Sequence, residues 1–406
     1  MGAGLGESYA PNRVEDPPQP RLPRSGCRGQ SNFQLIAEAS RHSKISSFSV
    51  LLLCSTPCRP TRYLCWPGGW VRLRGPRPPG FVEVLVRRLS VGVCVLALVG
   101  LAVVQPGSAQ AAAGPSSVRR VGVEDFADPG FAHFGSKYYL FRTGAGYGAR
   151  WTTSGGWSAV HKSMAAIPAW VDHSKPLLWA PEVFQSSDSR GALYVMYFTG
   201  ESASRHVHCI GVATSRHPAG NYTPGSKPVV CSPWVSRGYE AIDPAAYRAK
   251  DGKRYLIYKS DYRNASGFQI RAVQMDTQTG TRVVGKSIAK IVSSTRIEGP
   301  SVIAHGGKVW LFASRGDYIN CSYNTDVWSA NTFWGGRFTR VKTLMTTRST
   351  RLCGPGGATV INVGGTTRIA FHAYVDANHN GVKDSNKRQA YTGVVKWTSK
   401  GIPYLA

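Results

Sequence analysis

The sequence predicts an all-β fold, a five-bladed β-propeller that follows an unstructured leader and a signal peptide. Three observations predict it: a strand pattern that recurs five times, a composition rich in turn residues, and an N-terminal region without any sustained period. Of the 406 residues, 45 are glycine and 25 are proline, while only 17% are charged. Such a composition favours short strands joined by turns and argues against a coiled coil or a protein of long helices.

The first 83 residues are expected to form an unstructured leader. Proline and arginine are scattered through them, and their apolar residues show neither helical nor alternating spacing. Such a segment cannot bury enough apolar surface to offset the entropy lost on ordering. A signal peptide normally begins a chain. We therefore interpret the leader as a start placed too far upstream, with translation beginning at Val84 or Val86.

Residues 84–113 have the three parts of a secretory signal peptide. Arg87 and Arg88 come first, an apolar run over 89–104 follows, and small residues end at Ala111 or Ala113. The alternative is an uncleaved membrane anchor, since a run of this length just spans a bilayer with help. We expect export, cleavage near Ala111 or Ala113, and a secreted protein that is not attached to a membrane.

Four of the nine cysteines lie after the signal peptide: Cys209, Cys231, Cys321 and Cys353. In an exported chain, four cysteines suggest two disulfides. Cys209 and Cys231 flank one predicted strand pair, and Cys321 and Cys353 flank another, so we pair them in that way. This part contains no C-x-x-C pair, so a zinc cluster is not expected.

The repeated pattern is a turn glycine followed by an apolar, aromatic-rich strand. Equivalent residues of successive copies are 56, 61, 55 and 58 residues apart, so five units fill residues 120–406. The copies are Gly135–Phe141, Gly191–Tyr197, Gly252–Tyr258, Gly307–Phe312 and Gly365–Phe371. Units of this length with strand signals and no helical period are typical of propeller blades. The alternative is a β-sandwich with accidental spacing.

A small polar cluster containing proline precedes each turn glycine by seven to nine residues. Four of the clusters place a carboxylate at what the pattern indicates is an equivalent position: Asp128, Glu182, Asp243 and Glu298. The first strands of propeller blades line the central channel, so Asp128, Asp243 and Glu298 are expected to meet over one pocket. Neighbouring carboxylates repel, which raises the pKa of at least one of them. An acid with a raised pKa beside an ionised base is what glycoside hydrolysis needs. For any single Asp-Pro, a turn is the alternative.

These residues resemble glycoside hydrolase family 43, five-bladed propeller enzymes that cleave arabinose- and xylose-containing polysaccharides. The resemblance covers residues 122–380, and its landmarks include residues 179–182, 241–244 and 297–300. It implies that Asp128 is the general base that activates a water and Glu298 the general acid that protonates the leaving oxygen. Asp243 would be the third carboxylate, which orients the acid and raises its pKa. The family inverts configuration.

The resemblance also implies roles for residues around this trio. Trp179 and Glu182 are expected to bind substrate, and His372 to face a structural calcium or a water cluster in the channel. A buried core histidine is the alternative for His372. No cofactor is expected to be required. Gly357 stands where arabinan-cleaving members often carry a histidine.

Two weaker signals have simpler interpretations. Residues 376–384 imitate the start of a calcium loop, but position twelve is Lys387 rather than a bidentate glutamate, which favours an Asn-Gly turn. Six tryptophans could stack on sugar rings or pack between blades: Trp151, Trp157, Trp170, Trp234, Trp328 and Trp334.

The net charge is +27, of which residues 114–406 carry +19 without a concentrated basic run. Nucleic-acid binding would need a basic stripe on a known module, so it is not expected. The charge favours a polysaccharide partner of acidic type, such as pectin or uronic-acid-bearing xylan. We expect a monomer.

The sequence therefore predicts an exported, inverting glycosidase that cleaves α-L-arabinofuranosyl linkages in arabinan or arabinoxylan of plant cell walls. A β-xylosidase of the same family is the alternative. Retaining fructan-cleaving propellers usually have arginine before the middle Asp-Pro, where this chain has Ile242. A non-catalytic carbohydrate-binding propeller would be expected to lack one of the three carboxylates, and none is missing.

Overall fold

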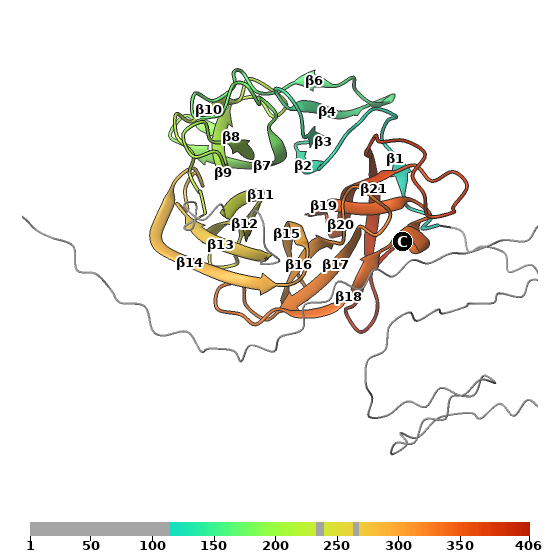
Figure 1. Cartoon of the computed structure of the whole chain (residues 1–406). Coiled ribbons are helices and arrows are strands. Elements are labelled where there is room, and N and C mark those ends of the chain that lie inside the picture. The colour runs from blue at the N-terminus through green and yellow to red at the C-terminus, as the bar shows by residue number, and fades with distance from the viewer. Residues whose placement is uncertain (1–113, 233–238, 263–267) are drawn as a thin grey trace, which may run out of the picture. The chain divides into compact units, whose positions relative to one another are not determined.

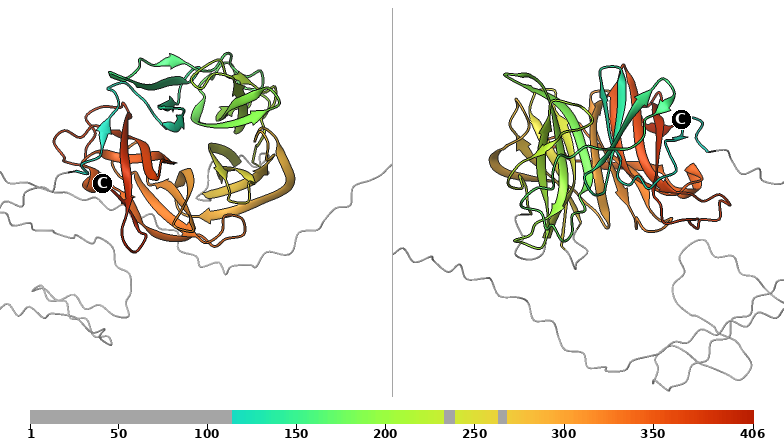
Figure 2. Two further views of the ribbon diagram at one scale, coloured as in Figure 1. Left: turned by 180° about the vertical axis from the view of Figure 1, so that it is seen from behind. Right: turned by 90° about the horizontal axis from the view of Figure 1, so that it is seen from above.

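The computed structural model describes residues 114–232, 239–262 and 268–406. The predicted leader (1–83), the predicted signal peptide (84–113) and Trp234 lie outside these residues. The described part forms five antiparallel sheets arranged in a ring, seen from both faces in Figures 1 and 2. The predicted all-β, five-bladed propeller is confirmed. Over the described residues, no helix has the length and apolar character needed to cross a membrane.

Each blade is a meander whose first strand is innermost (Figure 1). Blade 1 contains β2 (Gly130–Phe134), β3 (Lys137–Arg142), β4 (Gly148–Thr153), β5 (Gly156–Trp157) and β6 (His161–Lys162). Blade 2 contains β7 (Trp179–Asp188), β8 (Gly191–Glu201), β9 (His208–Ser215) and β10 (Thr223–Pro224). Blade 3 contains β11 (Tyr239–Arg248), β12 (Arg254–Tyr262), β13 (Gln269–Met275) and β14 (Val283–Ser293).

Blades 4 and 5 complete the ring. Blade 4 contains β15 (Ile297–His305), β16 (Lys308–Arg315), β17 (Asn324–Ala330) and β18 (Thr339–Met345), and the short helix α1 (Thr347–Thr350) follows it. Blade 5 contains β19 (Cys353–Val363), β20 (Thr366–Tyr374), β21 (Gln389–Trp397), β22 (Pro403–Leu405) and β1 (Arg119–Arg120).

The ring is closed by the segment that precedes blade 1. Strand β1 pairs with β21, so this early segment belongs to the last blade (Figure 1). The Ser117 amide donates to the Ala406 carbonyl at 2.8 Å, and the Val121 amide donates to the Ala390 carbonyl at 2.9 Å. Backbone hydrogen bonds therefore join the two ends of the propeller.

The five repeated segments form the second strand of each blade, and these strands are buried on both faces. In β8, Met196 and Phe198 pack into the cluster shared with blade 1, whereas Val195 and Tyr197 pack into the cluster shared with blade 3. Successive side chains of a strand point to opposite faces. A strand between two neighbouring blades therefore needs a continuous apolar run rather than an alternating one.

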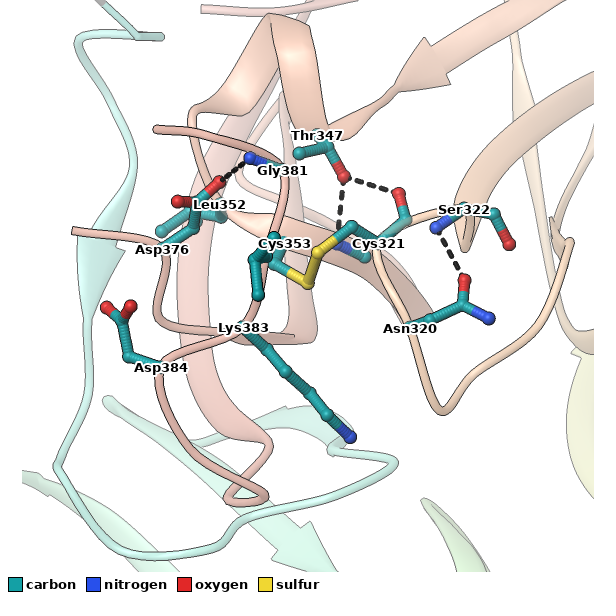
Figure 3. Close-up of a disulfide and its surroundings, with 12 residues drawn as sticks. Asn320, Cys321, Ser322, Thr347, Leu352, Cys353, Asp376, Gly381, Lys383 and Asp384 are labelled. Carbon is teal, nitrogen blue, oxygen red and sulfur yellow. Dashed lines mark hydrogen bonds between the residues drawn. A yellow bond between two sulfur atoms is a disulfide. The ribbon is translucent and has the colours of Figure 1, made fainter. Parts of the chain in front are cut away.

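Both predicted disulfides, Cys209–Cys231 and Cys321–Cys353, are present. The second joins the loop before β17 to the first residue of β19, and so links blades 4 and 5 (Figure 3). Thr347 Oγ1 donates to the Cys321 carbonyl at 2.6 Å and accepts the Gly354 amide at 3.0 Å. Blade 5 thereby holds a blade 4 loop that reaches the central pocket.

The residues with weaker signals have structural partners. Asp376 is buried, and its carboxylate accepts the amides of Asn380 and Gly381 at 3.0 and 2.9 Å within one turn (Figure 3). Trp170 stacks on Phe198, and Trp328 lies in the cluster between blades 3 and 4, as expected of tryptophans that pack blades.

Candidate active site

Every blade has a left-handed residue just before its first strand or within the first half of that strand. The five residues have φ values of 50°, 46°, 53°, 55° and 58°, and they are Asp128, Ala180, Asp243, Gly299 and Gly357. This backbone region disfavours any side chain, at a cost of about 1 kcal/mol or more for each non-glycine residue. All five residues line one cavity of about 420 Å³. The left-handed conformation thus recurs in all five blades at residues that line the pocket, and in two blades the residue is aspartate.

The structure corrects the register that the sequence pattern indicates for the carboxylates. Asp128 and Asp243 occupy the equivalent left-handed position, but Glu298 precedes the left-handed Gly299 by one residue. Glu182 follows the left-handed Ala180 by two residues. Asp128, Asp243, Glu298 and Glu182 nevertheless all line the same cavity. A cavity of this volume lies in the range of small-molecule sites.

Asp128 lies beside positive and hydrogen-bonding groups. Its Oδ2 accepts the Thr143 hydroxyl at 2.7 Å, and its Oδ1 lies 3.4 Å from Arg388 Nη1. Burial raises the pKa of Asp128, but its neighbours, foremost the Arg388 guanidinium and also the Thr143 hydroxyl, outweigh burial and leave it below its ordinary value. Asp128 is therefore an ionised carboxylate at neutral pH, which is the state a general base requires.

His372 supports Asp128 from the channel. Its Nδ1 accepts the Asp128 amide at 3.0 Å, and its ring is fully buried. Burial lowers the pKa of His372 to about 3, so the ring is neutral and carries its proton on Nε2. Nε2 has no hydrogen-bond partner among the described residues.

The calcium role expected of His372 stays a prediction, because His372 is not part of a cluster of metal-type side chains among the described residues. Over the described residues, one group of three metal-type side chains lies close enough to share an ion, and it consists of Asp172, Glu201 and His206. This group does not include His372. The Lys175 ammonium lies 2.7 Å from Glu201 and already supplies a positive charge there.

Asp243 has the same backbone conformation as Asp128 but the opposite electrostatic surroundings. Its Oδ2 accepts the Gly299 amide at 3.0 Å. Burial raises the pKa of Asp243 to about 7, the Glu298 carboxylate adds to this rise, and the Lys259 ammonium opposes it. Asp243 therefore keeps its proton to a higher pH than an ordinary aspartate does.

Glu298 is held by two donors, one on each carboxylate oxygen. Lys259 Nζ lies 2.8 Å from Oε2, and the Tyr323 hydroxyl donates to Oε1 at 2.9 Å. Tyr323 comes from the loop that the Cys321–Cys353 disulfide ties to blade 5. A Cβ at Gly356 would lie 2.2 Å from the Tyr323 ring, so this glycine leaves the space that the ring needs.

Gly357, where the sequence departs from the arabinan-cleaving pattern, also makes room for a ring. A Cβ at this position would lie 2.6 Å from the His372 imidazole. Its left-handed backbone favours glycine for a second reason. A histidine at residue 357 would therefore clash with His372 as it is placed here.

Trp179 and Glu182 lie on the wall of the cavity. The Trp179 indole stacks on His208 at 3.9 Å, and His208 Nδ1 lies 2.8 Å from Glu240 Oε1. Burial raises the pKa of Glu182 to about 8. Glu182 also lines a second cavity, of about 760 Å³, at the far ends of the inner strands. Glu182 thus lies along the channel, between the two cavities.

Sequence reasoning missed four residues that contact the carboxylates: Thr143, Lys259, Tyr323 and Arg388. Tyr323 and Arg388 lie outside the repeated clusters, on segments whose approach to the pocket depends on the folded ring. Lys259 lies in a repeated strand and could have been found from the sequence. The equivalent residues of blades 1, 2 and 4 carry hydroxyl groups, so a lysine at this position departs from the repeat.

A carboxyl group with a lowered pKa that shares a sugar-sized pocket on the propeller axis with a carboxyl group of raised pKa is the arrangement of a glycosidase. Comparison with known families agrees. The family model described as glycosyl hydrolases family 43 matches residues 120–403, and the chain belongs to this family. The resemblance that the sequence motifs indicate is confirmed.

Comparison of sequences and of structures finds proteins that this chain is similar to. The extracellular endo-α-(1→5)-L-arabinanase 1 of Bacillus subtilis (strain 168) is 24% identical over 277 residues, which are 63% of this chain and 81% of that protein. A thermostable family-43 glycoside hydrolase has a TM-score of 0.59 at 18% identity, covering 72% of this chain and 95% of its own. The arabinanase of Cellvibrio cellulosa complexed with arabinohexaose has a TM-score of 0.56 at 20% identity, covering 71% and 96%.

Proposed function

We propose that the protein is a secreted, inverting glycosidase that cleaves α-L-arabinofuranosyl linkages in plant cell-wall polysaccharide. Asp128 is the general base, Glu298 the general acid and Asp243 the carboxyl that shares the acid's proton. The contrast that carries this proposal is between Asp128, whose pKa is lowered beside Arg388, and Asp243, whose pKa burial and the neighbouring Glu298 raise to about 7. Base and acid catalysis need an ionised and a protonated carboxyl group at the same pH.

In the proposed reaction, Asp128 takes a proton from a water while the water oxygen attacks the anomeric carbon. Glu298 gives its proton to the glycosidic oxygen as the bond between that oxygen and the anomeric carbon breaks. The configuration at the anomeric carbon inverts, as expected when water attacks from the face opposite the leaving group. Exchange with solvent then restores the proton on the acid and removes it from the base.

The arabinan preference is supported by the Bacillus relative, whose name states that substrate and an extracellular location. A β-xylosidase is the second candidate, because Gly357 departs from the pattern of arabinan-cleaving enzymes and a β-xylosidase has a similar fold. Trp179 and Glu182 would contact the sugar from the cavity wall. The net charge of +19 over residues 114–406 supports an acidic polymer as the natural form of the substrate.

The proposed reaction uses no cofactor, and the protein is proposed to act as a monomer. Its proton transfers involve only side chains that line the cavity or touch those that do. Treatment with a chelator followed by assay with and without calcium tests this point. Unchanged activity supports a metal-free mechanism, whereas loss that calcium reverses would contradict it.

The proposed function is tested with purified residues 114–406 on arabinan, arabinoxylan, xylan, aryl α-L-arabinofuranoside and aryl β-xyloside. Release of arabinose or arabino-oligosaccharides, with inverted configuration by proton NMR, is the expected result. Release of xylose alone would favour the second candidate. Binding to polysaccharide without any cleavage would favour a non-catalytic propeller.

A further inference from the structure

Lys259 occupies a position that recurs in every blade. It lies in β12 and pairs with Ile242, the residue before the left-handed Asp243. In each of the other blades, an equivalent residue lies opposite the residue that precedes the left-handed one. Strand pairing shows this in blades 2, 4 and 5, and a backbone hydrogen bond shows it in blade 1. In chain order the five residues are Thr143, Thr199, Lys259, Ser314 and His372.

In four blades this side chain accepts a hydrogen bond from the next blade around the ring. The donor is in each case the amide of the left-handed residue, at distances between 2.8 and 3.1 Å. The pairs are Ala180 to Thr143, Asp243 to Thr199, Gly357 to Ser314 and Asp128 to His372. We call this repeated contact the inter-blade bond.

Blade 3 breaks the pattern, because an ammonium group has no lone pair with which to accept a hydrogen bond. The Gly299 amide, which would make the inter-blade bond to blade 3, donates instead to Asp243 Oδ2 at 3.0 Å. The Lys259 ammonium lies 2.8 Å from Glu298 Oε2. One substitution in the repeat therefore reorganises both carboxyl groups of the acid side.

A lysine at this position is costly to the fold. Lys259 is only 5% exposed, and lysine is rarely so buried because its charge must leave water. Threonine or serine makes the inter-blade bond in three other blades, so folding alone would be served by a hydroxyl. The buried charge is better explained by what it does to Glu298.

We propose that Lys259 is a positioning residue for the acid, which holds the Glu298 carboxyl in the pocket and stabilises the carboxylate left when its proton passes to the glycosidic oxygen. This inference rests on the proposed function and deepens it. The proton moves from Glu298 to the leaving oxygen as that oxygen separates from the anomeric carbon, and Lys259 keeps its own protons throughout. Glu298 becomes negative next to a fixed positive charge, so the products of proton transfer are stabilised more than the reactants.

Several charged or titratable groups of the described residues face this contact. Tyr323 donates to Glu298 from the loop before β17, and Asp243 lies beside Glu298 on β11. Asp128 acts on Asp243 from blade 1, with Arg388 and His372 beside it. The Lys259 ammonium itself opposes the rise in the pKa of Asp243. Removing this ammonium should therefore let Asp243, next to Glu298, keep its proton to higher pH.

The test compares Lys259→Thr, Lys259→Met and Lys259→Arg in the full chain, with Lys253→Met as control. Threonine supplies the inter-blade acceptor of blades 1 and 2 and should fold at least as well as the wild type. Lys253 is half exposed on the β11–β12 turn and pairs with Asp251. Thermal unfolding establishes that each variant is folded before its rates are compared.

We expect Lys259→Thr and Lys259→Met to lower kcat on arabinan by about 10- to 100-fold, within the range of general acid catalysis. An aryl arabinoside whose leaving group needs no proton should lose less than about 5-fold. The alkaline limb of the kcat profile should move up by about one pH unit. Lys259→Arg should keep the wild-type limb, and Lys253→Met should match the wild type throughout.

Two results would overturn the proposal: an alkaline limb that stays in place in folded Lys259→Thr and Lys259→Met, or equal losses on both substrates. Either would assign Lys259 a purely structural role. If the wild type cleaves no substrate, the proposed function fails, but carbon-13 NMR of the carboxyl groups still tests this inference. A higher titration midpoint for the Asp243–Glu298 pair in Lys259→Met supports it, and an unchanged midpoint contradicts it.

Discussion

Asp128 and Asp243 occupy equivalent positions of two blades, with φ values of 50° and 53°, yet the pKa of the first is lowered and that of the second is raised. On the base side, the guanidinium of Arg388 and the hydroxyl of Thr143 keep the pKa of Asp128 below its ordinary value despite burial. On the acid side, burial and the neighbouring Glu298 raise the pKa of Asp243 to about 7. The repeat positions the two carboxyl groups, and the side chains that differ from blade to blade set their pKa values.

The largest effect on kcat should come from replacing the proposed base, Asp128, or the proposed acid, Glu298. Asp128→Asn removes the base and Glu298→Gln removes the proton donor, so each should lower kcat on arabinan by about 1,000-fold or more. Only Glu298→Gln should recover much of its rate on an aryl arabinoside with a good leaving group, because that step needs no proton. Rates on the two substrates measure this difference. Full activity of either variant on arabinan would remove that residue from the mechanism.

The next largest effect should come from the Cys321–Cys353 disulfide, which holds the Tyr323 loop next to Glu298 on the acid side. Replacing Cys321 and Cys353 together by serine should lower the free energy of unfolding by about 3–4 kcal/mol, from loop entropy alone. It should also lower kcat, because Tyr323 loses its restraint next to Glu298. Denaturant unfolding and steady-state kinetics measure the two effects.

The matched control replaces Cys209 and Cys231, which join residues of blade 2 and its following segment. This pair of substitutions should reduce stability by a similar amount and leave kcat close to that of the wild type. Equal losses of kcat in the two double variants would contradict a specific role for the Tyr323 loop.

A third effect should appear on the base side alone. Arg388→Met removes the cation that lowers the pKa of Asp128, so this pKa should rise and the acidic limb of kcat/KM should move to higher pH. The loss should be about 10-fold near pH 5 and small at pH 7, where Asp128 is still ionised. A pH profile of kcat/KM measures it. A shift of the alkaline limb instead would contradict this account, because it would mean that Arg388 acts on the carboxyl groups of the acid side rather than on Asp128.

The smallest effect concerns Glu182, which lies between the two cavities. Its pKa is about 8 in the folded chain and near its ordinary value of 4.5 when unfolded. The folded state then binds more protons between these two values, so stability falls as pH rises through this window. Glu182→Gln should therefore raise the free energy of unfolding by about 1–3 kcal/mol at pH 8 and change it little at pH 4. A stabilisation that is equal at both pH values would contradict the raised pKa.

Much of the propeller could be predicted because its cause is local and repeated. The turn glycines and apolar second strands of residues 135–141 and 191–197 recur in each blade, since each of these strands packs on both faces. The two disulfides followed from the order of four cysteines. The motifs also brought Asp128, Asp243 and Glu298 to one pocket, although they misjudged the register of Glu298 by one residue.

The environments of these carboxyl groups could not be predicted in the same way. Arg388 is separated from Asp128 by 260 residues and meets it only because the last blade closes against the first. Tyr323 reaches Glu298 through a loop that has no repeat. The contact that His372 makes with the base side is hidden in the sequence in the same way, since its Nδ1 accepts the amide of Asp128, 244 residues away.

The most direct test of the account is a carbon-13 NMR titration of the carboxyl groups, with Asp128→Asn and Asp243→Asn variants to assign the two signals. We predict that Asp128 titrates below the ordinary value for aspartate, while Asp243 titrates near pH 7. Titration of both groups below pH 5, or the reverse order, would contradict the claim that the pKa values of the two equivalent aspartates are shifted in opposite directions.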